Sequence, residues 1–101
     1  MAMSKPISLS VSVKTPDGIV YRDLQGEAVL LNLNTGIYFG LDLVGTRIWS
    51  LLQEQRSLQQ ILDCLLQEYE VTEAQCREDL LNLIAQMREK GLIEVSNGTT
   101  S

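Results

Sequence analysis

Apolar and polar residues alternate near the start of the chain, which indicates extended structure. Residues 8–13 place Leu9, Val11 and Val13 on one face, the period-two pattern of a half-buried strand. Further short apolar runs follow, and turn-forming residues separate them. The predicted strands after the first cover residues 19–24, 28–33 and 37–41. The turns fall at residues 15–18, 25–26 and 34–36.

The apolar spacing becomes helical after residue 42. Asp42 is a suitable N-cap for a helix over about residues 43–54. Capping-box patterns at residues 57–60 and 72–75 predict the starts of two more helices. Gly91 is expected to end the third helix, and a short extended segment at Leu92, Ile93 and Val95 follows.

This order of elements predicts an α+β fold that is winged helix-turn-helix-like, with a three-stranded antiparallel β-sheet followed by three α-helices. One domain is expected over residues 8–95, after a flexible N-terminus at 1–7 and before a disordered tail at 96–101. Residues 8–13 leave two placements open. They either cap the far edge of the sheet, which we favour, or pair with a second copy to form a dimer.

Composition excludes several functional classes. The chain of 101 residues has 45% hydrophobic residues, a net charge of −5 and only eight scattered basic residues. Nucleic acids and acidic membrane surfaces are therefore poor partners. The sequence contains no histidine, no CxxC and no phosphate-binding loop, so we expect neither an enzyme nor a metal or other cofactor. Cys64 and Cys76 are expected to be reduced thiols of a cytoplasmic protein, with a redox pair as the alternative.

Residues 26–49 carry an ordered set of features: a Leu-Leu-Asn strand, a Thr-Gly turn, the pair Tyr38-Phe39, Leu41-Asp42, Gly45 and Ile48-Trp49. This set resembles the PqqD-like family, the recognition elements that bind precursor peptides in ribosomal natural-product pathways. The similarity extends over about residues 18–95. Asp42 stands where the family usually has asparagine, which keeps the capping role.

The resemblance implies a non-catalytic protein that binds the leader of a precursor peptide as an added strand, in a groove shared with the third helix. It also implies a second partner, a leader peptidase or other modifying enzyme. Within the family, the sequence looks most like members from lasso-peptide pathways. The alternative within the family is a peptide chaperone for a radical enzyme, as in pyrroloquinoline quinone synthesis. The expected peptide-binding residues are Ile37, Tyr38, Phe39, Gly40, Leu41, Asp79, Leu80, Leu83 and Met87.

The residues themselves agree with a groove at this place. Tyr38 and Phe39 must point to opposite faces of a strand, so one ring can enter the core while the other stays at the surface. Apolar residues of the third helix span an arc of roughly 160°, wider than packing on a small sheet requires. Leu83 and Leu81 lie at the two margins of this arc, and we expect the Leu83 margin, next to Asp79, to form the groove wall.

Two other classes stay open on the sequence alone. A winged helix could bind nucleic acid, although the charge opposes it. The domain could also be a dimerisation module that uses residues 8–13, and a monomer or weak homodimer is expected in either case. Among these readings, leader-peptide recognition accounts for the largest number of sequence features.

Overall fold

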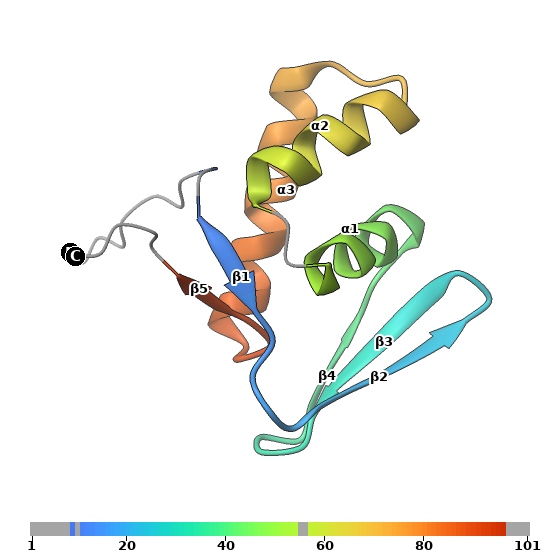
Figure 1. Ribbon diagram of the computed structural model, residues 1–101. Coiled ribbons are helices and arrows are strands. Elements are labelled where there is room, and N and C mark those ends of the chain that lie inside the picture. The colour runs from blue at the N-terminus through green and yellow to red at the C-terminus, as the bar shows by residue number, and fades with distance from the viewer. Residues whose placement is uncertain (1–8, 10, 55–56, 97–101) are drawn as a thin grey trace.

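The computed structural model describes residues 9, 11–54 and 57–96, the last of them by its backbone alone. Figure 1 shows a curved three-stranded sheet, three helices that follow it in the chain, and a separate two-stranded ribbon. The elements are β1 (Ser12–Lys14), β2 (Ile19–Leu24), β3 (Glu27–Asn32), β4 (Ile37–Gly40), α1 (Leu43–Gln53), α2 (Leu58–Glu68), α3 (Glu73–Glu89) and β5 (Glu94–Ser96). The predicted α+β fold, three antiparallel strands followed by three helices, is confirmed.

The main sheet has the order β2-β3-β4 with antiparallel pairing throughout. Its two faces differ because successive side chains alternate across a strand. Ala28, Leu30 and Asn32 of β3 are buried and define the inner face, whereas Val29 and Leu31 lie on the outer face and are half-buried. The Thr46 hydroxyl accepts a hydrogen bond from the Ala28 N–H at 2.9 Å, which fixes α1 against the inner face.

Side-chain caps begin all three helices. The Asp42 carboxylate accepts from the Gly45 N–H at 2.7 Å, and Ser57 forms a reciprocal capping box with Gln60. The prediction of a second capping box was wrong in one half. Thr72 accepts from the Gln75 N–H, but the Gln75 side chain donates to Asp79 Oδ1 at 2.9 Å instead of returning to the cap.

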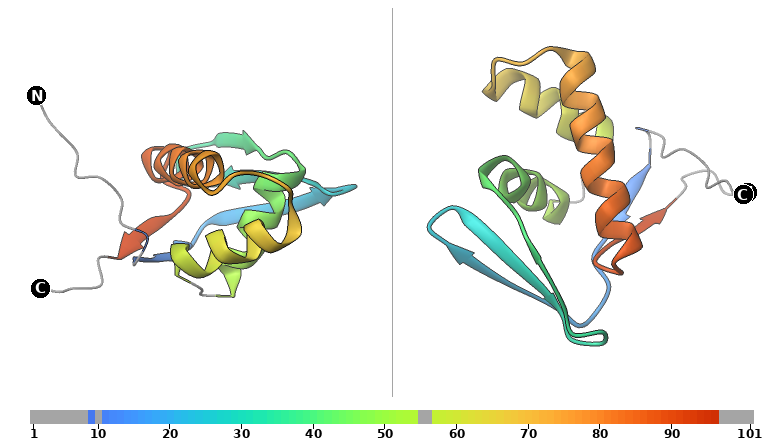
Figure 2. Two further views of the ribbon diagram at one scale, coloured as in Figure 1. Left: turned by 90° about the horizontal axis from the view of Figure 1, so that it is seen from above. Right: turned by 180° about the vertical axis from the view of Figure 1, so that it is seen from behind.

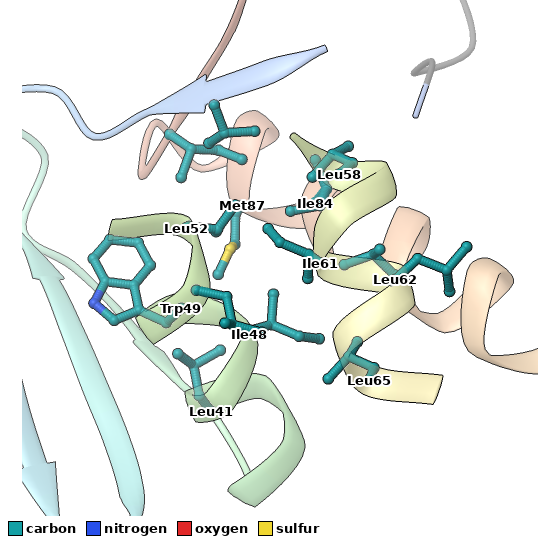
Figure 3. Close-up of a cluster of buried hydrophobic side chains, with 14 of the residues drawn as sticks. Leu41, Ile48, Trp49, Leu52, Leu58, Ile61, Leu62, Leu65, Ile84 and Met87 are labelled. Atoms are coloured by element: carbon teal, nitrogen blue, oxygen red, sulfur yellow. The ribbon is translucent and has the colours of Figure 1, made fainter. Parts of the chain in front are cut away.

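The core lies between the inner sheet face and the three helices, as Figure 3 shows. Each helix contributes its apolar stripe, and Trp49 of α1 is buried in the core, only 4% exposed. Tyr21 of β2 stacks on this ring, with the ring centroids 6.4 Å apart. The side chains with no exposed surface include Leu30, Leu58, Ile61, Leu62, Leu80, Ile84, Met87 and Leu92.

The favoured placement of residues 8–13 was wrong. β1 does not extend the main sheet but pairs with β5, with Val13 opposite Val95. On its other side, Ser12 forms an isolated antiparallel bridge with Ser57, the N-cap of α2. Just before β1, the Val11 and Leu9 carbonyls accept from the Leu58 and Gln59 N–H groups at 3.2 and 2.8 Å. Leu92 and Ile93, which follow α3, are buried in the same core. Their burial brings β5, the next segment of the chain, beside β1. The predicted N-terminal segment 1–7 lies outside the described residues. So do residues 97–101, whereas the backbone of Ser96 is paired.

Candidate peptide-binding cleft between β4 and α3

β4 pairs with β3 along one side, and no described strand pairs with its other side. The Leu41 N–H donates to the Ala28 carbonyl at 2.8 Å, so these two residues occupy a hydrogen-bonded position of the ladder, although the Ala28 N–H donates to the Thr46 hydroxyl instead of to Leu41. Such pairs alternate with non-hydrogen-bonded pairs in antiparallel ladders. The backbone groups of Phe39 therefore face β3, whereas those of Tyr38 and Gly40 face outward. β4 thus offers two residues whose N–H and C=O groups can bond an added strand.

The opposite edge of the same sheet, β2, is also unpaired within the described part of the chain. It carries Arg22 and Asp23, and charged side chains discourage strand addition at an edge. Residues 35–41, which include β4, contain no charged side chain. The β4 edge is therefore the better acceptor for a peptide strand.

A cavity of about 540 Å³ lies directly beside this edge. Figure 2, seen from behind, shows β4 and α3 on the two sides of this region, with α1 and the end of α2 beyond them. Its floor is apolar and buried, formed by Ile48, Leu65 and Leu80. The half-buried Phe39 and Leu83 form opposite walls. The complete lining is Phe39, Gly40, Leu41, Asp42, Val44, Gly45, Ile48, Leu65, Tyr69, Val71, Cys76, Asp79, Leu80, Leu83 and Gln86.

The only charged side chains in this lining are the carboxylates Asp42 and Asp79. Asp42 Oδ1 caps α1, and Asp79 Oδ1 accepts from Gln75, so each carboxylate is oriented by a neighbour. Cys76 is a free thiol in the same lining. Burial raises the pKa of the Cys76 thiol, and the nearby Asp79 carboxylate raises this pKa further. The cavity therefore combines apolar surface with two carboxylates and a thiol whose raised pKa favours the protonated form.

The structure brings six of the nine sequence-predicted site residues together in the cavity lining: Phe39, Gly40, Leu41, Asp79, Leu80 and Leu83. Ile37 and Tyr38 lie on β4 outside the cavity, and Tyr38 is 70% exposed while Phe39 packs on the core. Met87 was wrongly assigned to the groove. Its side chain is 0% exposed and lies near Leu52, Ile48 and Ile84 in the core (Figure 3). Met87 lies about one turn beyond Leu83, on the side of α3 that packs toward α1 and α2.

Sequence reasoning missed the residues that α1, α2 and the segment after α2 contribute, among them Val44, Ile48, Tyr69 and Val71. Val44 and Val71 are exposed apolar residues, 41% and 47% respectively. The one sequence feature that could have pointed to these residues is an apolar residue just after a helix, as at Val71. Its position opposite β4 follows from helix packing, which periodicity does not report.

Other classes of site are not evident in the described ranges. Those residues contain no group of three or more His, Cys, Asp or Glu side chains placed to hold a metal ion. In the same residues, no helix combines the length and the apolar composition needed to cross a bilayer. The cavity beside β4 thus remains the main candidate site.

Fold and site together define a small α+β domain with an open strand edge beside an apolar cleft. Residues 27–93 match the family described as coenzyme PQQ synthesis protein D (PqqD). The chain therefore belongs to the PqqD family, and none of the curated proteins gives a significant match.

Two solved structures are similar over most of the chain. One, TbiB1 in complex with the TbiA(β) leader peptide, is 40% identical with a TM-score of 0.77, and the match covers 87% of this chain and 99% of that one. The other, a lasso peptide synthetase B1 complexed with the leader peptide, is 23% identical with a TM-score of 0.75, covering 82% and 98%. The second similarity shows the shared fold.

Proposed function

We propose that this protein binds the leader segment of a ribosomally made precursor peptide and presents the precursor to a leader peptidase or other modifying enzyme. The pathway class that we propose is lasso-peptide biosynthesis. The observation that carries the proposal is the uncharged edge of β4, which no described strand pairs and which lies directly beside the apolar cavity. Membership of the PqqD family and the 40% identity to TbiB1, which was solved with a leader peptide, support it.

Binding would proceed by strand addition. Outward N–H and C=O groups of Tyr38 and Gly40 would bond the leader backbone, which gives affinity with little dependence on sequence. Alternate leader side chains would point into the cavity, where apolar groups are removed from water by Phe39, Leu80 and Leu83. Asp79 would favour a polar or basic leader residue at the cavity rim. No covalent bond is made or broken when the leader binds. Cleavage or modification of the precursor would be carried out by the partner enzyme, and both proteins would act in the cytoplasm.

Fluorescence anisotropy tests the proposal directly. The probe is a fluorescein-labelled leader peptide of the precursor that is encoded beside this protein's gene, and a scrambled peptide is the control. We expect saturable binding with a Kd of about 1 µM or tighter. A folded protein that does not bind this leader would contradict the proposal.

A pair of variants locates the site. Leu83→Asp puts a charge on the cavity wall and should weaken binding at least about fiftyfold, because the carboxylate would be desolvated by the bound peptide. Leu81→Asp is the matched control, since Leu81 is also half-buried on α3 but does not line the cavity. Equal loss in both variants would mean that general destabilisation, not the cleft, explains the effect. Far-UV circular dichroism establishes that both variants are folded.

A further inference from the structure

Gly40 is the one described glycine whose presence the fold itself does not explain. Four of the six described glycines have positive φ, where other residues are strained. At Gly45, an added Cβ would lie 3.2 Å from atoms of Asp42 and Leu41. Gly40 has neither restriction, and a Cβ built there would have no atom within 4 Å.

A glycine in a strand is less stable than alanine, and it often marks a place where a ligand approaches the backbone. Gly40 is the last residue of β4 and one of the two residues whose backbone groups face outward on the proposed leader-binding edge. The Cβ of a strand residue stands perpendicular to the sheet, so a side chain at this position would not block strand addition. What glycine leaves free is the space above β4 on the outer face.

That space leads to a second hollow. It has a volume of about 380 Å³ and is lined by Leu24, Glu27, Ala28, Val29, Gly40, Leu41 and Asp42. The strand register puts Leu24 opposite Glu27 and Val29 opposite Gly40, all on the outer face. Leu24 is 52% exposed and Val29 is half-buried, so the floor is aliphatic while Glu27 supplies an exposed carboxylate.

An aliphatic floor with a carboxylate at its far end fits a long side chain with a cationic head, because lysine and arginine bury their methylene stems and keep the charge in water. Asp42 adds a second carboxylate to the lining, and the net charge of −5 also favours a cation. Arg22, which lies on the same outer face, would repel a bound cation. The guanidinium is attached to β2, two strands or about 10 Å from β4.

On the basis of the proposed function, we infer that Gly40 is a specificity-determining residue. Its missing side chain lets a lysine or arginine of the bound leader cross β4 on the outer face and pair with Glu27. Leader residues adjacent to this cation would point the other way, into the larger cavity. The two hollows on either side of β4 would then recognise alternating basic and apolar residues of one peptide strand.

Binding of the labelled leader to three variants tests this inference. Gly40→Ala should weaken binding about tenfold while the thermal midpoint stays equal or rises. Glu27→Gln should weaken it about fivefold, and Arg22→Gln should strengthen it slightly. The matched control is Glu89→Gln, because Glu89 is an exposed carboxylate that lines neither hollow.

A double-mutant cycle identifies the partner of Glu27. Each lysine and arginine of the leader is replaced in turn by norleucine, and each peptide is titrated against wild type and Glu27→Gln. One position should lose affinity for wild type but little for the variant. Additive losses at every position, a bound segment without lysine or arginine, or unchanged affinity of Gly40→Ala would overturn the inference. Failure of wild type to bind any leader would overturn the proposed function together with it.

Discussion

β1 and β4 are both short strands with a single strand neighbour, yet the fold treats their second edges in opposite ways. β1 has β5 on one side and the Ser12–Ser57 bridge on the other, and in the residues just before β1 the N–H groups of Leu58 and Gln59 donate to the carbonyls of Val11 and Leu9. These donors belong to the first turn of α2, where N–H groups have no partner within the helix. One contact thus satisfies a strand edge and a helix start.

The second edge of β4 has no such cover among the described residues, although α3 lies nearby across the cavity. Proteins usually protect exposed edges with charges, proline or covering elements, because unpaired strands promote association. β4 itself carries no charge or proline, no element in the described ranges covers its second edge, and apolar cavity walls flank it. The comparison shows that a few backbone hydrogen bonds from a helix start are enough to cover a strand edge in this fold. The uncovered edge of β4 is therefore consistent with a site that binds a peptide strand.

Proline substitutions on β4 should give the largest effects and test the assignment of inward and outward backbone groups. Phe39→Pro removes an N–H that faces β3 and should destabilise the protein by about 3 kcal/mol or more. Tyr38→Pro removes an outward N–H, so it should cost below about 1 kcal/mol of stability but weaken leader binding about tenfold.

Urea unfolding and anisotropy measure the two quantities. Tyr38→Ala serves as the control, since it removes the same exposed ring and keeps the N–H. A Tyr38→Pro variant that binds like Tyr38→Ala would argue against strand addition at this edge.

Asn32 should give the next largest effect because it sets the position of α3 relative to the open edge. Its amide donates to the Gly91 carbonyl at 3.1 Å and accepts from the Asn34 N–H at 2.9 Å. Asn32→Leu should lower the free energy of unfolding by about 1–3 kcal/mol, since these groups lose partners in a mostly buried place. Leader affinity should fall as well because α3 is less firmly held. If the folded Asn32→Leu variant binds the leader as tightly as wild type, the bond between Asn32 and Gly91 does not shape the cleft.

Gln59→Pro tests the closed edge. Gln59 is exposed and lies in the first turn of α2, where proline is tolerated. The substitution removes the 2.8 Å bond to the Leu9 carbonyl and should cost about 1 kcal/mol in urea unfolding. Leader affinity should stay within twofold of wild type, or about 0.4 kcal/mol. A larger loss of affinity would show that the two edges are coupled.

The smallest effect concerns pH and the Cys76 thiol in the cleft. Because folding raises the pKa of this thiol, the folded protein holds the proton more tightly than the unfolded chain. The contribution of the protonated thiol to the free energy of unfolding is complete below the unfolded-state pKa of about 8.5, and it is lost as the pH rises through the folded-state pKa. Urea unfolding from pH 7 to 10 should therefore show a slightly steeper decline for wild type than for Cys76→Ala. Parallel curves would argue against the assigned shift.

Much of the fold was predictable from local patterns. The bounds of α1 and α2 and the position of Gly91 follow from caps and apolar spacing, which depend on neighbouring residues only. The partner of residues 8–13 was not predictable, because pairing between the two ends of a chain depends on how the helices between them pack. Met87 shows the same limit, since its apolar character fits both a groove and a core, and only the packing of α3 against α1 and α2 decides between them.

The sequence by itself determined which segments become strands and helices, the absence of charge along residues 35–41, and the alternation that sends Tyr38 and Phe39 to opposite faces of β4. The structure showed that Phe39 is the ring that packs on the core. These are properties of backbone periodicity and of single residues. The tertiary structure alone decided that β1 is closed by α2, that β4 stays open, and that Val44, Tyr69 and Val71 join Leu83 around one cavity. The physical reason is that an edge or a cavity is defined by what packs beside it, and those neighbours come from distant parts of the chain.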